Sequence, residues 1–519
     1  MRFKKKEGPF MKRTLSFALC LCLLLCGIST AQAEKLFPET VRLSFLTATN
    51  ANYDTQQMDL YNYIEELTNV KIDVSYSSSM AETLTTMLAT DTLPDIFHVN
   101  GINMFQLVSE GAVVNLGDYL DKIPNYTRWL ESSELATGKN LEDGGLYGIN
   151  FLTLYPPTFS LNERADWLKN LGLEQPETLD EWLTVWRAIR DNDANGNGDP
   201  TDEIPYGDAA NVWAACEYPM TGLLSVFGIK SNGIFYYDDE GNYKLVYEHP
   251  RYREYLELCR LMYEEGLVDK EVFTHTSRDV EQLFYSNTVF SCTGWISYPP
   301  YAYNTISETN PNVEPICAEP IVGPYGDQLI PARAKKGNLY AININTVENG
   351  KLDAILEFIN WIYSDEGIQA TNYGREGTHS TTDETGYKKY VSGILDGDSN
   401  TLRKLGLINQ TFLGLWTEDS YNQITTRNIP REELDYSTSL KMAGTEIYAD
   451  NYFVTPATLE TIAWAEYSTD LMPSIETLRA SCITGEITVD EFFEGYEKLS
   501  SYGVDAINEQ AQNAWTELN

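Results

Sequence analysis

Apolar and polar residues alternate with two periods in the first part of the chain. The run VRLSFLT at residues 41–47 and the alternating VKIDV at 70–74 have the pattern of strands. Residues 60–67 place apolar side chains on one helical face, and 84–88 mark a second helix before the short apolar run at 93–99. Strand, helix, strand, helix and strand joined by short links predict a parallel sheet with crossover helices. We therefore expect an α/β lobe here.

The same two periods return further along the chain. Residues 146–163 are extended and interrupted by two prolines, and a helical pattern resumes at 179–191. A second extended stretch at 337–346 precedes residues 352–362, whose apolar side chains form one helical stripe. The C-terminal part is expected to be helical, with TVDE at 488–491 as a capping box. These elements predict a second α/β region, and we find no internal repeat.

The N-terminus has the organisation of an export signal. Six basic residues precede an apolar run at 15–28, and Ala31-Gln32-Ala33 follows. This arrangement predicts a secretory signal peptide over residues 1–33, and the run is too short for a comfortable membrane span. Alternatively, LLLCG at 23–27 resembles a bacterial lipoprotein box in which Cys26 carries a lipid anchor, although Leu25 is larger than that pattern prefers. Both routes predict an extracellular or cell-surface protein.

The composition excludes several classes of function. The chain carries 76 acidic and 37 basic residues, a formal net charge of −39, and its length suits two or three domains. This charge repels phosphate backbones, so we expect no nucleic acid partner. The five cysteines after the leader form no CxxC pair and have no histidine at ligand spacing, which favours buried thiols over zinc or disulfides. No GxxxxGK[ST] motif occurs, so no nucleotide hydrolysis is expected.

Six stretches resemble, in the same order, the extracellular solute-binding proteins of bacterial ABC sugar importers, the class that includes the maltose-binding protein. They cover nearly the whole chain after the leader. The stretches are LPDIFHVNG (93–101), GGLYGINFLTLYPPTFSLNE (144–163), LELCRLMYEEGLVDKEVF (256–273), LFYSNTVFSCTGWISY (283–298), YSDEGIQATNYGREGTH (363–379) and ITGEITVDEFFEGYEKLSSYGVDAINE (483–509).

The resemblance implies a fold and a function. The fold would be α/β, a two-lobed periplasmic-binding-protein fold with an interlobe cleft and crossing hinge segments. Residues 38–152 plus 335–375 would form the N-terminal lobe, and 153–334 plus 376–519 the C-terminal lobe. The protein would be a monomer and no enzyme. It would capture an oligosaccharide between its lobes by hinge closure and deliver it to the transmembrane subunits of an ABC permease.

Residues 193–205, DANGNGDPTDEIP, have the pattern of a calcium loop. Side-chain oxygens recur at every second position around two glycines, which suits a cation that takes six to eight oxygen ligands. A second register starts at Asp191, but its twelfth position is Asp202 where an EF-hand expects Glu. A solvated Asn-Gly turn without metal is the alternative.

Oligosaccharide-binding members of the family carry a very similar loop that holds a structural Ca²⁺. This chain has one extra residue before the Asp-Glu pair, which puts the last two ligands in question. The ligands implied by the resemblance are Asp193, Asn195, Asn197, the carbonyl of Asp199, Asp202 and Glu203.

Aromatic and amide side chains are the candidates for sugar binding. The chain has 34 Tyr and 10 Trp, and sugars combine apolar faces that stack on rings with hydroxyl groups that bind amides and carboxylates. Large aromatics are also common in cores, and a structural turn is the alternative for Glu376 and His379. We select candidates that follow predicted strands, lie near an expected crossing or match the family by resemblance. They are Trp295, Trp213, Asn52, Tyr53, His98, Asn100, Glu376, His379 and Trp416.

Other readings of the sequence stay open. A peptide or another non-sugar solute could occupy the same fold, and a secreted glycoside hydrolase would also be acidic and rich in aromatics. Basic residues near the expected crossings would favour an acidic oligosaccharide. They are Arg164, Arg333, Lys335 and Arg375.

Overall fold

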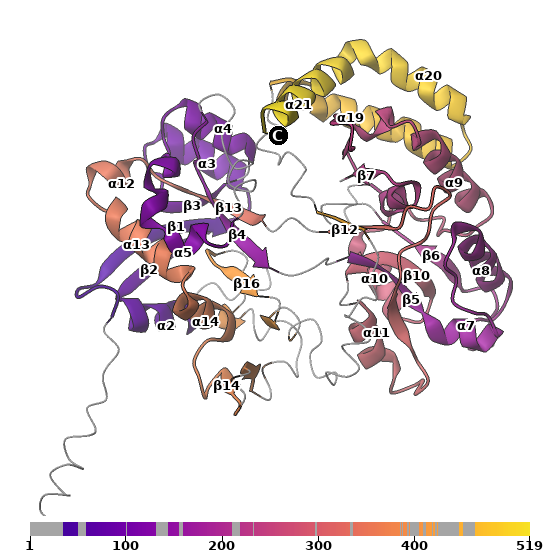
Figure 1. Cartoon of the computed structure of the whole chain (residues 1–519), viewed down its shortest axis with the longest axis horizontal. Coiled ribbons are helices and arrows are strands. Elements are labelled where there is room, and N and C mark those ends of the chain that lie inside the picture. The colour runs from indigo at the N-terminus through magenta and orange to yellow at the C-terminus, as the bar shows by residue number, and fades with distance from the viewer. Residues whose placement is uncertain are drawn as a thin grey trace, which may run out of the picture.

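Two sheets, each with its own helices and apolar core, divide the molecule into two lobes (Figure 1). The structure is a computed structural model. Within its described residues, no helix is long and apolar enough to cross a membrane. The described residues are 35–49, 59–99, 101–130, 144–154, 159–209, 218–231, 233–295, 298–332, 336–384, 386, 388–391, 394, 404–407, 412–417, 419–420, 423, 446–449 and 462–518.

The first lobe is built on a six-stranded sheet with the order β16-β4-β13-β3-β1-β2. Its strands are β1 (Val41–Ala48), β2 (Val70–Ser77), β3 (Ile96–Val99), β4 (Ile149–Leu154), β13 (Lys336–Ile342) and β16 (Leu415–Thr417). β1 pairs in parallel with β2 and β3, so the predicted parallel arrangement is confirmed. β13 runs antiparallel to β3 and β4, and β16 is parallel to β4.

Amphipathic helices cover this sheet. They are α2 (Asp59–Thr68), α3 (Met80–Ala89), α4 (Gly101–Ser109), η1 (Leu116–Lys122), α5 (Pro124–Thr127), α12 (Asn345–Glu348), α13 (Leu352–Ile362) and α14 (Asp365–Tyr373). The predicted apolar stripe of α13 is confirmed, since Ile355, Leu356, Ile359 and Ile362 are all buried. Each such side chain stabilises the fold by about 1.5–3 kcal/mol when it leaves water.

The second lobe is built on a four-stranded sheet with the order β11-β5-β10-β6. Its strands are β5 (Phe159–Arg164), β6 (Ile204–Gly207), β10 (Val289–Trp295) and β11 (Pro315–Ala318). β10 is parallel to β6 and antiparallel to β5. The helices that pack around it are α7 (Ala165–Leu171), α8 (Leu179–Asp191), η2 (Thr221–Phe227), α9 (Tyr252–Glu264), α10 (Ser277–Tyr285) and α11 (Tyr298–Ile306).

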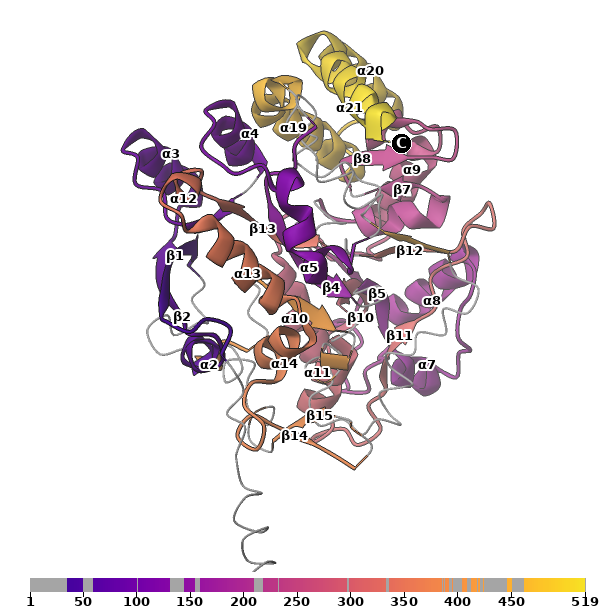
Figure 2. The ribbon, with the colours of Figure 1, turned by 60° about the vertical axis from the view of Figure 1, so that its left-hand side comes forward.

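C-terminal helices close one end of the second lobe. Figures 1 and 2 both show α19 (Ile462–Ile483), α20 (Val489–Leu499) and α21 (Val504–Leu518) together near α9 and the small sheet β7-β8-β9. That sheet consists of β7 (Lys230–Ser231), β8 (Phe235–Tyr237) and β9 (Tyr243–Leu245). The predicted capping box is confirmed: Thr488 accepts from the backbone of Glu491, whose carboxylate accepts from the backbone of Thr488. Trp515 of α21 stacks on Tyr243 with ring centroids 5.0 Å apart.

The chain passes between the lobes near the two expected extended stretches. It leaves the first sheet at Leu154 of β4 and enters the second at Phe159 of β5. It leaves β12 (Leu329–Ala332), which pairs with β17 (Glu446–Ala449), and enters the first sheet again at Lys336 of β13. The connecting residues 155–158 and 333–335 lie outside the described residues. The second connection includes Arg333 and Lys335.

The expected lobe boundary at residue 375 is too early. Tyr390, Leu407 and Phe412 are buried in the core of the first lobe, and β16 extends its sheet. The short hairpin β14 (Ser380–Thr382) and β15 (Lys388–Tyr390) joins them through the ring of Tyr390, 5.5 Å from that of Tyr373. This segment carries no regular apolar period, so its burial depends on tertiary contacts that the sequence pattern does not display.

Candidate functional site

Two of the predicted tryptophans lie on opposite sides of the first crossing between the lobes. Trp416 of β16 pairs with Thr153 of β4, and Trp295 of β10 pairs with Phe159 of β5. Thr153 and Phe159 are six positions apart along the chain, so their Cα atoms are separated by no more than about 22 Å. Both indole rings are partly exposed. The structure thus places one aromatic side chain from each lobe beside the same connection.

Close packing at the end of β10 positions Trp295. The strand is buried from Val289 to Gly294, and Trp295 is its first partly exposed residue. A Cβ atom at Gly294 would lie 2.4 Å from the ring of Tyr298. Glycine is therefore required there, because it lets this ring approach the backbone beside the tryptophan.

A buried asparagine positions Trp416 on the other side. Asn372 donates from Nδ2 to the carbonyl of Leu415, 2.7 Å away, and accepts from the hydroxyl of Ser420 at 2.6 Å. The Trp416 ring meets Phe151 edge to face, with centroids 5.7 Å apart. Asn372 and Phe151 were not selected from the sequence, since only the fold brings α14, β4 and β16 together.

His98 lies within β3 instead of following it. It is opposite Tyr340 of β13, with ring centroids 5.7 Å apart. Burial lowers the pKa of His98, so the imidazole is neutral at pH 7. Its Nδ1 atom is buried and has no hydrogen-bond partner among the described residues. Asn52, Tyr53, Asn100 and Trp213 lie outside the described residues.

Glu376 and His379 are held by local contacts of the first lobe. The Glu376 carboxylate accepts from the backbone N–H of Thr382 at 2.6 Å and forms an ion pair with Lys388 at 3.1 Å. His379 is buried, and its Nδ1 accepts from the backbone N–H of Arg375 at 3.2 Å. These contacts support the alternative of a structural turn.

Two of the four basic residues expected near the crossings, Arg164 and Arg375, are engaged elsewhere. Arg164 is at the far end of β5 from the crossing and forms a fully buried ion pair with Asp166. Arg375 binds the carboxylates of Asp59 and Glu66 on α2. The expectation that Arg164 lies near a crossing is wrong, because the chain enters β5 at Phe159 and runs away from it.

Two buried charged side chains contact the described residues that flank segment 210–217, the segment that contains Trp213. Asp208 follows β6 and accepts from the Tyr206 hydroxyl at 2.8 Å and from the Ala209 N–H at 2.7 Å. Burial raises the pKa of Asp208 to about 6. At the other end, Arg479 of α19 donates to the carbonyl of Pro219 at 2.9 Å. The residues that flank this segment are therefore rigidly anchored in the second lobe.

The predicted calcium loop forms a compact turn ahead of β6. Asp193 accepts from the N–H of Gly198 at 3.0 Å, and Asn195 from that of Asn197 at 2.9 Å. Gly196 and Gly198 have φ of +73° and +96°, a conformation that glycine adopts without strain. The loop thereby gathers its polar side chains on one inner side.

Carboxylate and amide groups of this loop converge on one another. The amides of Asn195 and Asn197 donate to the two oxygens of Asp202, at 3.1 and 2.7 Å. Glu203 accepts from the N–H of Asn195 at 3.3 Å, and burial raises its pKa. One carboxylate oxygen each of Asp193 and Glu203 is buried without a partner among the described residues.

These residues fit an oxygen-preferring cation, because two buried carboxylate oxygens remain unsatisfied. Among the described residues, however, no group of three or more His, Cys, Asp or Glu side chains is arranged to hold a metal. The 193–203 loop lies before the first residue of β6, Ile204, whereas the end of the sheet at the crossing lies beyond its last residue, Gly207. The loop is therefore separated from the crossing by the length of β6, on the order of 13 Å.

The sequence is similar to those of known binding proteins. The sequence profile described as bacterial extracellular solute-binding protein matches residues 56–369. The fructooligosaccharide ABC transporter substrate-binding protein FusA of Streptococcus pneumoniae is 29% identical over 301 residues, 53% of this chain and 55% of FusA. The polygalacturonan/rhamnogalacturonan-binding protein YtcQ of Bacillus subtilis is 22% identical over 466 residues, 87% of each chain. The match to FusA therefore spans about half of that relative's length.

Solved structures share the two-lobed fold. The alginate-binding protein AlgQ2 without calcium ion has a TM-score of 0.71 and 21% identity, covering 93% of this chain and 100% of that chain. FusA of S. pneumoniae in complex with kestose has a TM-score of 0.68 and 21% identity, covering 92% and 99%. These likenesses confirm the α/β, two-lobed fold expected from the sequence. Since the family profile spans more than half of the chain, the protein belongs to the family of bacterial extracellular solute-binding proteins.

Proposed function

We propose that this protein is the extracellular substrate-binding component of an ABC transporter, which captures an oligosaccharide between its lobes and delivers it to a membrane permease. The observation that carries the proposal is the placement of Trp416 and Trp295 on either side of the first crossing. The carbohydrates named for FusA and YtcQ support the same substrate class.

Closure of the two lobes would use the aromatic rings as platforms. Each ring offers an apolar face to the C–H groups of one sugar unit, and the two partly exposed tryptophans lie at the last position of β10 and at the middle position of β16. A sugar that contacts both rings binds the closed state better than the open one and shifts the population toward it. Arg164 and Arg375 are committed to carboxylates of the protein, so neither is free to pair with an acidic sugar.

A Ca²⁺ ion in the 193–203 loop would be a structural clamp. Asp193, Asn195, Asn197, Asp202 and Glu203, with the carbonyl of Asp199, would hold it. The ion would neutralise carboxylates that otherwise repel one another, and it would take no part in binding sugar.

The remaining features of the proposal concern export and assembly. Residues 1–33 would direct export, with the lipid anchor at Cys26 as the alternative to cleavage after Ala33. The mature protein would act as a monomer outside the cytoplasmic membrane, without catalysis of its own.

The test is a thermal-shift and calorimetric panel on residues 34–519. Fructo-, malto- and milk oligosaccharides are compared with oligogalacturonates and with short peptides. A sugar present at 100 times its Kd should stabilise the protein by about 2.7 kcal/mol. The incubated sugar should remain intact by chromatography, because cleavage would indicate a glycoside hydrolase. Stabilisation by peptides alone would contradict the proposed substrate class.

Tryptophan variants locate the binding surface. We expect Trp295→Ala and Trp416→Ala each to raise the Kd for the best oligosaccharide about 30-fold, as for a central aromatic contact. Trp129→Ala is the matched control, since this indole is also partly exposed but lies against α13 in the first lobe and donates to the carbonyl of Tyr363. Equal effects of all three substitutions would exclude the proposed surface.

A further inference from the structure

A polar cavity lies on the second lobe, at the end of the sheet remote from the crossing. Its volume is about 570 Å³, within the range of small-molecule sites. β10 begins at Val289, just after the cavity residue Asn287, and runs to Trp295 at its other end, on the order of 20 Å away. The cavity is therefore separate from the two tryptophans and does not depend on the function proposed for them.

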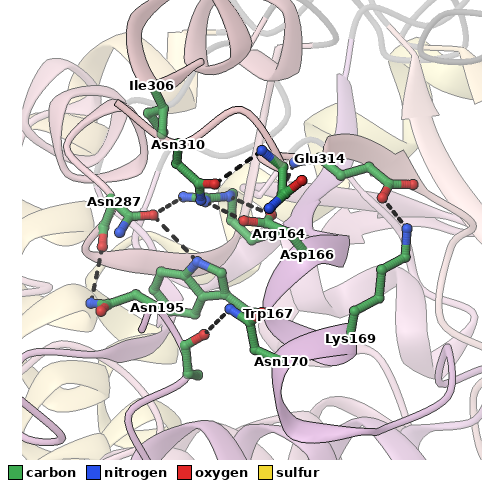
Figure 3. A network of polar contacts seen from close by, with 12 residues as sticks. Arg164, Asp166, Trp167, Lys169, Asn170, Asn195, Asn287, Ile306, Asn310 and Glu314 are labelled. Atoms are coloured by element: carbon green, nitrogen blue, oxygen red, sulfur yellow. Dashed lines mark hydrogen bonds and ion pairs between the residues drawn. The ribbon is translucent and has the colours of Figure 1, made fainter. Parts of the chain in front are cut away.

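Its floor is a rigid network of buried polar groups (Figure 3). Arg164 donates from Nε and from one terminal nitrogen to the two oxygens of Asp166, at 2.9 and 2.6 Å, and both side chains are almost completely buried. Asp166 also accepts from the N–H of Glu314 at 3.1 Å. Because the cation neutralises the carboxylate, the floor presents no net charge.

One wall holds an amide whose orientation is fixed. The Oδ1 atom of Asn287 accepts from Arg164 and from the indole N–H of Trp167. The amide nitrogen is therefore directed away from these donors, as Figure 3 shows, and makes no hydrogen bond to a described residue. The backbone carbonyl of Asn287 accepts from the Asn195 amide at 3.3 Å, which connects this wall to the 193–203 loop.

The opposite wall combines amides and hydroxyls with apolar surface. Asn310 ends the turn after α11 and accepts from the N–H of Asn312 at 3.0 Å, while Thr309 is exposed beside it. Ile306 is buried and belongs to the lining of the cavity. The ring of Tyr285, stacked on that of Tyr301 at 5.8 Å, adds an aromatic edge to the lining.

We propose that this cavity binds a neutral sugar unit. The amide N–H groups of Asn287 and Asn310 can donate to sugar hydroxyl oxygens, and the second lone pair of the Asn310 Oδ1 atom can accept from a hydroxyl. The largely buried isoleucine and tyrosine add a small apolar part to the lining. Among the residues that the structure describes around this cavity, a phosphate or uronate would find no uncompensated cation, because Arg164 at the floor is paired with Asp166.

Methyl NMR of residues 34–519 tests the proposal directly. In protein labelled at isoleucine δ1-methyl groups, maltose, cellobiose, sucrose and lactose are titrated separately to 100 mM in buffer with CaCl₂. We expect at least one of them to shift the Ile306 methyl resonance in a saturable manner, while that of Ile359, in the core of the first lobe, stays unchanged. The shift should persist in Trp295→Ala, which separates it from binding at the crossing.

Matched asparagine variants show whether the shift reports this cavity. Asn310→Ala should raise the fitted Kd about tenfold, the effect of one lost hydrogen bond. Asn349→Ala is the control, because Asn349 accepts from the N–H two residues ahead in the same way but lies on the first lobe. An unchanged Kd in Asn310→Ala, or no Ile306 shift with any disaccharide, would overturn the proposal. So would a shift with glucuronate or phosphate alone.

Discussion

The two ends of the second-lobe sheet are built from different chemistry. At the crossing end, β10 finishes in one partly exposed indole, and the nearby carboxyl of Asp208 is buried and hydrogen-bonded. At the remote end, amides and carboxylates gather around the 193–203 loop and the Arg164–Asp166 pair. The same four strands therefore support an aromatic surface at one end and a polar network at the other. Because the two ends share no side chains among the described residues, a substitution at one end should leave the structure of the other end unchanged.

The largest expected effect is at the remote end. Asp166→Asn leaves the buried Arg164 without its counter-ion, which should lower the free energy of unfolding by about 3–5 kcal/mol. Urea denaturation measures it. The control is Asp73→Asn, because Asp73 forms an ion pair with Arg42 whose side chains are 56% and 63% exposed. That change should cost less than about 1 kcal/mol, and equal costs would show that the buried network is dispensable.

Beside Arg164, near the remote end, Glu163 of β5 should make stability depend on pH. Burial raises its pKa to about 8 from a usual 4.5. The native state then retains a proton that the unfolded chain releases, so stability falls as pH rises from 4.5 to 8, by about 1.4 kcal/mol per pH unit. Glu163→Gln should lower the slope by this amount in urea denaturation at pH 5, 6.5 and 8, most clearly between pH 6.5 and 8, above the pKa of about 6 of another buried carboxyl, Asp208. The control Glu82→Gln changes an exposed residue of α3 and should keep the slope of the parent protein. If the slope is unchanged in both variants, the pH dependence does not come from Glu163.

Calcium binding should stabilise the remote end of the second-lobe sheet without changing sugar binding at the crossing end. Free Ca²⁺ at 100 times its Kd should raise the free energy of unfolding by about 2.7 kcal/mol relative to EDTA, through a loop remote from the crossing. Asp202→Ala should abolish this gain, whereas Asp353→Asn, an exposed change on the first lobe, should preserve it. The Kd for oligosaccharide should change little with EDTA. A large loss of sugar affinity would mean that the ends are coupled.

The smallest expected effect is at the crossing end. Gly294→Ala brings a methyl group against the Tyr298 ring and should destabilise the protein by about 1–3 kcal/mol while displacing Trp295. Sugar affinity should fall with it. In a double-mutant cycle with Tyr298→Ala, the two changes should not add, since the ring that causes the clash is gone. Additive costs would point to a backbone effect instead.

The sequence predicts the first lobe better than the site. Parallel strands and the stripe of α13 are visible as local periods, and their contacts follow from them. The direction in which β5 runs from the crossing depends on its pairing with other strands, which the local sequence does not show. The sequence analysis therefore places Arg164 near the crossing, whereas it lies at the opposite end of β5. The role of Asn372 depends on β16, which joins the sheet from more than forty residues further along the chain. The converging oxygens of the 193–203 loop were foreseeable, because their spacing is short and encoded in consecutive residues.

The five residues between Thr153 and Phe159 would also tie the two proposed half-sites together. For an oligosaccharide that reaches both indoles, stacking on one ring turns the second contact into an intramolecular event. Its strength is then set by an effective concentration, in the millimolar range for short connections. Two weak surfaces can in this way act as a bivalent receptor. Sugars too short to span them would bind as monovalent ligands, so affinity should rise steeply at one chain length.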